Sequence, residues 1–147
     1  MAREYVFPVI LTRDDVDGGF VITCPDLPEV VTQADDVPSA IDCATDAVEE
    51  AVAGRLRRGE EVPLPGRGGS GDVTVALPPV MTAKVALTTA MREAGTTKTR
   101  LAEVLGVDEK EVRRLLDPRH PSKMARLERA LKSLGKGLVV RVVDRVA

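Results

Sequence analysis

The sequence predicts an α+β fold in two parts, a strand-rich half followed by a helical half. Short segments with apolar residues at every second position dominate the first half, whereas beyond residue 82 apolar residues recur at spacings of three and four. The change of period follows Pro78-Pro79, and such pairs mark linkers because proline fits neither a helix interior nor a sheet ladder. We therefore expect domains over residues 1–78 and 79–147.

The charge distribution divides the chain at the same place. Residues 1–78 carry 6 Lys or Arg against 15 Asp or Glu, a net charge of −9, and residues 79–147 carry 15 against 8, a net charge of +7. This asymmetry indicates a basic half that binds a polyanion and an acidic half that either meets a basic partner or only keeps the chain in solution. A chance distribution of solvated charge is the alternative.

Composition argues against several classes of function. Aromatic residues make up 2% of the chain and lie near its start, which disfavours stacking on single-stranded nucleic acid. Cys24 and Cys43 lack the spacing of a disulfide framework or a zinc site. No apolar run approaches the ~18 residues of a membrane span, and no signal-type segment follows the N-terminus. We expect a cytoplasmic protein with no membrane partner, metal or cofactor.

The first half predicts the order β-β-β-α-β. Strands over residues 5–12 and 20–24 flank an Asp- and Gly-rich turn and form a hairpin. Pro8 cannot donate to a ladder, which predicts an edge position or a bulge for the first strand. A third strand covers 29–34, and a fourth over 72–77 follows a Gly- and Pro-rich loop.

An amphipathic helix is expected between the third and fourth strands. Asp36 is its expected N-cap, Pro38 is tolerated in its first turn and Gly59 is its expected end. Apolar residues between 40 and 52 recur at helical spacing, so one face covers the sheet. The opposite face is acidic and carries Asp42, Asp46, Glu49 and Glu50.

The second half predicts four helices and a last strand. The helices cover about 82–94, 98–105, 109–116 and 122–134, and their expected N-caps are Thr82, Thr97, Asp108 and Ser122. Glu111 is expected to complete a capping box with Asp108, and Val107 to pack on Val112 as a hydrophobic staple. The strand over 138–146 either pairs with its copy in a second chain or covers its own domain.

The string LAEVLGVDEKEVRRLL at residues 101–116 resembles the two central helices of the Cro/CI-type helix-turn-helix family. Ala102 is small enough for close helix contact, Gly106 makes the turn, and Val107, Val112 and Leu115 are expected to close the core between the helices. The resemblance implies that residues 109–116 form a recognition helix in the major groove of double-stranded operator DNA.

Basic residues around this helix are the candidate DNA contacts, and a solvated basic face is the alternative for any one of them. Asp108 and Glu109 stabilise the helix N-terminus through its dipole but repel DNA, which favours Arg113 and Arg114 as the base-reading residues. His120 is either structural or a phosphate contact. The full set is Lys98, Lys110, Arg113, Arg114, Arg119, His120 and Lys123.

No arrangement of residues predicts catalysis. Asp14, Asp15 and Asp17 could suggest a Mg²⁺ site for a metal-dependent nuclease, but turn chemistry explains them better, because an EF-hand spacing and a nearby His are both missing. The Gly-rich stretch 66–71 lacks the Lys-Ser/Thr end of a P-loop. We expect no catalytic residue and no enzyme.

Taken together, the chain resembles a HicB-type antitoxin. The resemblance rests on residues 18–33, GGFVITCPDLPEVVTQ, on the acidic helix, and on the helix-turn-helix that ends at Leu134-Gly135-Lys136. It implies a partial RNase H-like fold that has lost catalysis and binds HicA, a small basic toxin that degrades mRNA. It also implies a homodimer or higher homo-oligomer that represses its own operon, with recognition helices ~34 Å apart.

Acidic side chains are the candidate contacts for that basic toxin. They are Asp26, Glu29, Asp35, Asp36, Asp42, Asp46 and Glu49. A stand-alone transcription regulator whose first module senses a small ligand is the alternative hypothesis. An adjacent gene for a small, basic, single-His protein would favour the antitoxin.

Overall fold

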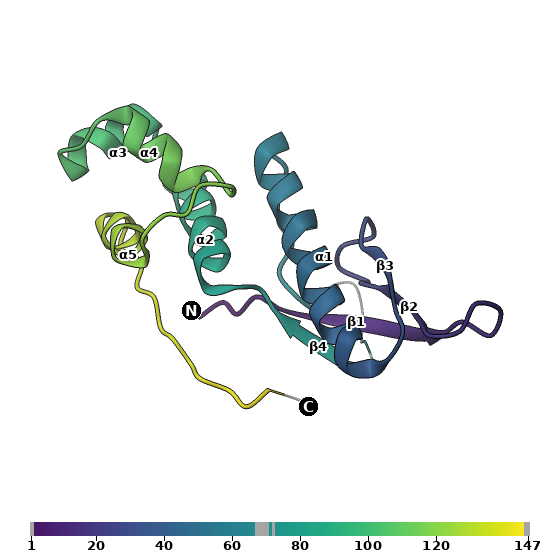
Figure 1. Cartoon of the computed structure of the whole chain (residues 1–147). Coiled ribbons are helices and arrows are strands. Elements are labelled where there is room, and N and C mark those ends of the chain that lie inside the picture. The colour runs from purple at the N-terminus through teal and green to yellow at the C-terminus, as the bar shows by residue number, and fades with distance from the viewer. Residues whose placement is uncertain (1, 67–70, 72, 146–147) are drawn as a thin grey trace. The chain divides into compact units, whose positions relative to one another are not determined.

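The structure is a computed structural model of the chain and describes residues 2–66, 71 and 73–145 (Figure 1). It contains two compact units. The sheet unit comprises Met1–Arg55, Glu61–Pro78 and Asp144–Ala147, and the helical unit comprises Leu56–Glu60 and Pro79–Val143. The described residues form an antiparallel sheet and five helices, so the expected α+β class is confirmed.

The sheet has four antiparallel strands in the order β3-β2-β1-β4. They are β1 (Val6–Arg13), β2 (Phe20–Thr23), β3 (Val31–Ala34) and β4 (Val73–Ala76). The turn between β1 and β2 forms as expected, because Gly18 and Gly19 take positive φ and Asp14 accepts backbone hydrogen bonds from Val16 and Asp17. The predicted order β-β-β-α-β is confirmed.

Both alternatives that Pro8 predicted for β1, an edge position and a bulge, are wrong, because β1 is a central strand and its registers with β2 and β4 contain no extra residue. Its two halves pair with different strands: Val6–Val9 with β4 and Ile10–Arg13 with β2. The carbonyl of Pro8 faces away from β4 and accepts a hydrogen bond from the Cys24 thiol at 3.4 Å. The proline nitrogen lies on that same side, beyond the end of the β1–β2 register, so its missing N–H breaks no ladder bond.

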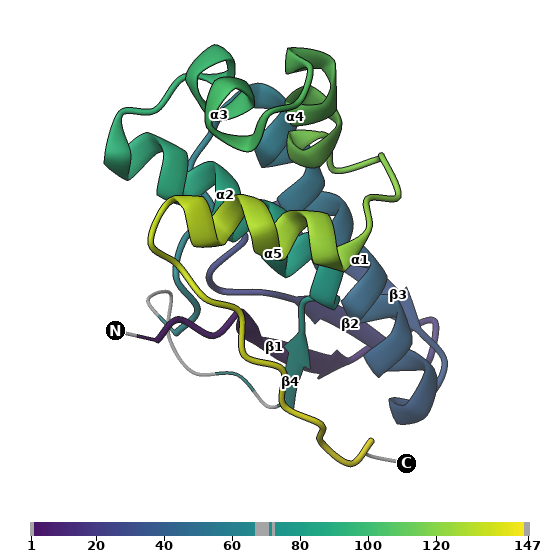
Figure 2. The same ribbon diagram turned by 90° about the vertical axis from the view of Figure 1, so that its left-hand side faces the viewer.

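Helix α1 (Val37–Arg58) runs along one face of this sheet (Figures 1 and 2). Its N-cap is Asp36, whose carboxylate accepts the Ser39 N–H at 2.8 Å, and it ends at Gly59, where φ is 70°. Ala40 and Ala44 of the helix are fully buried. The core beneath contains the β1 and β2 residues Phe7, Val9 and Ile22.

The helical unit contains α2 (Pro79–Ala94), α3 (Lys98–Leu105), α4 (Glu109–Leu116) and α5 (Met124–Ser133) (Figure 2). Its core is aliphatic, as the scarcity of aromatic residues requires. Helices α3 and α4 have the predicted bounds, because their start and stop residues act locally in sequence. Its fully buried members include Leu87, Leu101, Val112, Leu127 and Leu131.

Two predicted helix starts in this unit are wrong. Helix α2 begins at Pro79 and not after Thr82, because proline suits the first helical position, where its missing N–H has no partner in any case. Ser122 does not cap α5: the cap residue is Lys123, without a side-chain hydrogen bond. The Ser122 hydroxyl instead bonds to Lys84 and to the Arg114 carbonyl.

The predicted capping box at α4 is half correct. The Asp108 carboxylate accepts the Lys110 N–H at 2.9 Å and caps the helix. The Glu111 carboxylate does not return to the cap, because it forms ion pairs with Arg114 at 2.6 Å and Arg126 at 3.0 Å. The expectation that Val107 lies in the core between the helices is wrong, because its side chain is exposed. Its staple with Val112 stays a prediction.

Of the two alternatives for the predicted last strand over residues 138–146, a strand that covers its own domain is wrong for the described part, which ends at residue 145. Pairing with its copy in a second chain stays a prediction. Residues 136–145 are not assigned to a strand, and the sheet does not include them. A strand requires a partner for its backbone groups, and no other strand of the described chain pairs with this segment. Four of its side chains are highly exposed, namely Val139, Val140, Val142 and Val143.

Candidate functional site

The first candidate site is the pair of short helices α3 and α4, which three residues connect. Thr97 caps α3 by accepting the Arg100 N–H at 3.1 Å, and Gly106 ends it in the left-handed conformation, with φ of 66°. The inward faces bury Leu101 and Val112 completely. These local interactions fix the two helices and leave the charged side chains of α4 on the outside.

The two arginines of α4 are engaged by carboxylates of the same helix. Arg113 pairs with Glu109 at 2.9 Å, and Arg114 pairs with Glu111. The hydrogen bond from Arg113, with a second from Thr99, lowers the pKa of Glu109 below its ordinary value. Both candidate base-reading residues are therefore held by neighbouring acids in the free chain.

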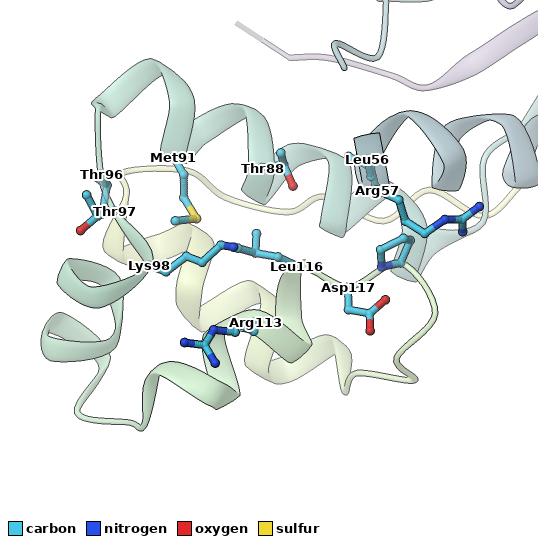
Figure 3. A pocket seen from close by; sticks show the side chains of 11 residues that line it. Leu56, Arg57, Thr88, Met91, Thr96, Thr97, Lys98, Arg113, Leu116 and Asp117 are labelled. Carbon is cyan, nitrogen blue, oxygen red and sulfur yellow. The ribbon is translucent and has the colours of Figure 1, made fainter. Parts of the chain in front are cut away.

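The three predicted lysines, Lys98, Lys110 and Lys123, carry no ion pair among the described residues. All three side chains are exposed. Figure 3 shows Lys98, at the start of α3, on the same side of the helical unit as Arg113 of α4. The positive charge of Lys98 also contributes to the lowered pKa of Glu109. The structure thus brings Lys98 into the electrostatic neighbourhood of the α4 residues.

The loop between α4 and α5 holds the other predicted contacts. Asp117 orders it by accepting the Arg119 N–H on its side chain at 2.9 Å and the His120 N–H on its carbonyl at 3.1 Å. Arg119 is exposed, whereas His120 is half-buried with Nδ1 3.2 Å from the Ser122 hydroxyl. That contact favours the structural alternative for His120.

Sequence reasoning missed Lys84 of α2. Its side chain is fully buried, and its ammonium group donates to the carbonyls of Arg114 and Leu115, each at 3.0 Å, and to the Ser122 hydroxyl at 2.8 Å. Burial lowers the pKa of Lys84, and the Asp117 carboxylate opposes that shift. Helical spacing could have found it, since Lys84 lies three residues before the inward-facing Leu87.

The second candidate site is the acidic surface of the sheet unit, and Asp26 does not belong to it. Asp26 is buried, and its carboxylate accepts the Gly66 N–H at 2.9 Å. Glu29 is exposed but holds Arg55 through two hydrogen bonds of 2.7 and 2.9 Å. Asp36 serves as the α1 cap, and the Ser39 N–H lowers its pKa below the ordinary value. Asp35 beside it is exposed.

The outer face of α1 supplies the rest of this surface. Asp42 and Asp46 are exposed, and Glu49 is half-buried. Asp42 pairs with Arg145 at 2.8 Å, but both side chains are largely in solvent, where such pairs contribute little. Within the described ranges, no group of three or more His, Cys, Asp or Glu could hold a metal ion, and no helix there combines the length and hydropathy needed to cross a membrane.

Comparison with known proteins assigns the family. A family model described as the HicB-like antitoxin of bacterial toxin-antitoxin systems matches residues 6–86. The chain belongs to this antitoxin family. The matched range covers all four strands, α1 and the start of α2, so it confirms the resemblance expected from residues 18–33.

Relatives of this HicB-like chain extend the likeness through the helical unit. It is 32% identical over 143 residues to Antitoxin HicB of Pseudomonas fluorescens strain Pf0-1, covering 97% of this chain and 98% of that protein. It is 32% identical over 137 residues to Antitoxin HicB of Escherichia coli K12, covering 93% and 99%. Antitoxin HicB 1 of Photorhabdus laumondii is 32% identical over 136 residues, covering 92% and 86%. The comparisons support a regulatory, non-enzymatic role.

Proposed function

We propose that the chain is an antitoxin with two separate working surfaces. The acidic surface of the sheet unit binds and neutralises a HicA-type toxin that degrades mRNA. The α3–α4 pair binds operator DNA as a helix-turn-helix and represses the chain's own operon. Membership of the HicB-like antitoxin family is the observation that carries the proposal.

The toxin surface is defined by the exposed acids that remain once Asp26 is removed from the predicted set. A basic ribonuclease must carry positive charge where it meets RNA, and an acidic face opposite that surface would attract it and cover it. We place Asp35, Asp42 and Asp46 at the centre of the contact, because the first is exposed and the other two project from the outer face of α1. Glu29, Asp36 and Glu49 flank them.

The DNA surface follows from α4 as the recognition helix. Lys110 is exposed and needs no rearrangement to meet DNA. Arg113 and Arg114 would exchange Glu109 and Glu111 for guanine edges or phosphates, since arginine binds both through two parallel donors. The exposed Lys98, Arg119 and Lys123 suit phosphate contacts, which position a protein on DNA without reading sequence.

The last part of the proposal is self-association. Helix-turn-helix proteins bind two half-sites as dimers, with recognition helices one DNA turn apart. Residues 139–143 include four exposed valines, a residue type that favours strands, and pairing of this segment with its copy in a second chain would satisfy its backbone groups. The partial RNase H-like character of the sheet unit stays a prediction.

The test is co-expression with the neighbouring toxin-sized reading frame, together with a reporter driven by the operon's own promoter. We expect the chain to restore growth and to silence the reporter. Cells that fail to grow although the reporter is silent would instead favour the stand-alone regulator. A reporter that stays active in rescued cells would contradict the DNA-binding half of the proposal.

A further inference from the structure

Lys84 is the one fully buried charged side chain of the described core, and every proton of its ammonium group has an acceptor. The three acceptors are the carbonyls of Arg114 and Leu115 and the hydroxyl of Ser122, at 2.8 to 3.0 Å. A charged group withdrawn from water is stable only if such hydrogen bonds replace its hydration. The pocket around Lys84 is therefore matched to a lysine.

Two of these acceptors lie at the C-terminal end of α4. The last four carbonyls of a helix lack partners within it, and the partial negative charge of the helix dipole gathers there. The Asp117 N–H satisfies two of these carbonyls by donating to those of Arg113 and Arg114. Lys84, on a different helix, donates to the Arg114 and Leu115 carbonyls and adds a full positive charge at the favourable end of the dipole.

The third acceptor connects the same ammonium to the loop after α4. The Ser122 hydroxyl also donates to the Arg114 carbonyl at 3.2 Å and lies 3.2 Å from His120 Nδ1. One buried cation thus fastens the end of α4 and the loop that carries Arg119 and Lys123 to α2. Both are segments that present candidate DNA contacts.

We propose that Lys84 is a positioning residue for DNA recognition: it never touches DNA, but it sets the position of Arg114 and of the 117–123 loop relative to α2. This inference rests on the proposed operator binding. The Arg114 backbone is bonded to Lys84 directly, so a displacement there moves the side chain that would meet a base edge. Base contacts require closer geometry than phosphate contacts.

The test compares Lys84→Met with Lys132→Met in the full chain. Methionine keeps the unbranched shape and most of the length of the lysine side chain but removes all three donors. Lys132 is exposed on α5 and pairs with Glu128, so its variant removes the same charge from the same unit without touching the buried cluster. Binding to operator DNA and to a scrambled duplex is measured over a series of salt concentrations, with circular dichroism as the check on folding.

Lys84→Met should lose roughly tenfold or more of its operator affinity, the scale of one lost base contact. Affinity for the scrambled duplex should change less than twofold, and the salt dependence should stay that of the wild type, since no phosphate contact is removed. Equal operator binding by Lys84→Met and Lys132→Met would overturn the inference. So would a salt slope reduced by about one, which would mean that Lys84 contacts a phosphate itself.

Two further measurements keep the inference decidable. If Lys84→Met does not fold, Ser122→Ala removes only one of the three acceptors and should still lower operator affinity several-fold, and an unchanged affinity would refute positioning. A wild-type chain that binds no operator would refute the proposed function instead. In that case the positioning role is tested by the hydrogen-exchange rate of the Asp117 backbone amide. The positioning role predicts faster exchange in Lys84→Met than in Lys132→Met. Equal rates in the two variants would refute it.

Discussion

The outer face of α1 and the outer face of α4 use charge in opposite ways. On α1, the exposed Asp46 has no ion-pair partner among the described residues, and the one partner of Asp42 is a solvent-exposed arginine of the tail. On α4, Arg113 and Arg114 are both held by carboxylates one turn away. The proposed toxin contacts on α1 therefore have few ion pairs to break before binding, whereas the proposed DNA contacts Arg113 and Arg114 would have to break theirs. Net charge alone did not reveal that difference.

The most severe test of this comparison is Arg113→Ala combined with Arg114→Ala. Losing two candidate base contacts should weaken operator binding roughly a hundredfold or more, while toxin neutralisation stays intact. Gel-shift titration and growth rescue measure the two effects. Arg92→Ala with Lys132→Ala is the control that removes two positive charges elsewhere in the helical unit. Operator binding that survives in the arginine variant would remove α4 from the DNA surface.

Reversing charge on the acidic face should give the next largest effect. Asp42→Lys with Asp46→Lys should slow association with a basic toxin by roughly tenfold at low salt, because electrostatic attraction acts mainly on the rate of encounter. The difference should shrink as salt is added. Stopped-flow binding is the measurement, and Asp15→Lys with Asp17→Lys in the β1–β2 turn is the matched control. A similar slowing in both variants would show that only total charge matters.

Glu109→Gln should have a smaller effect, of opposite sign to the arginine variants. Without the carboxylate, Arg113 is released and a negative charge near the DNA is removed, so operator affinity should rise about twofold to fivefold, the range of an exposed ion pair. Glu103→Gln, which releases Arg100 on α3, is the comparison. Weaker operator binding by Glu109→Gln would mean that the Glu109–Arg113 pair orients the arginine and does not restrain it.

The smallest expected effect is the pH dependence of the stability that the Glu109–Arg113 pair contributes. The pKa of Glu109 is lowered in the folded chain from its ordinary value of 4.5. The stability that the pair contributes is therefore fully present above that value and is lost as pH falls through the lowered pKa. The difference in unfolding free energy between wild type and Glu109→Gln should shrink as pH falls from 6 towards 3. A difference that stays constant over this range would contradict the ion pair.

Features that depend on neighbours in sequence could be predicted, and features that depend on tertiary contacts could not. Thr97, Gly106 and Asp108 bound α3 and α4 as expected, because caps and left-handed glycines act within one turn. Ser122 looked like another cap by the same logic. Its hydroxyl is taken by Lys84, 38 residues earlier in the chain, and no local pattern shows that competition.

The candidate sites follow the same division. Asp26 was grouped with the surface acids by composition, but its contact with the backbone of Gly66 removes it from the surface. Glu111 has the spacing of a capping box, yet Arg126 of α5 competes for its carboxylate. Leu138, Val140 and Val142 of the tail have the alternation of a strand, but a strand also requires an edge to pair with, and the single described chain supplies none.

Measuring growth rescue and promoter repression in the same cells tests the central claim of two separable surfaces most directly. The account predicts that the Asp42→Lys, Asp46→Lys chain still silences the reporter while its rescue of growth is impaired, and that the Arg113→Ala, Arg114→Ala chain rescues growth while the reporter stays active. Loss of both activities in either folded variant would contradict the claim.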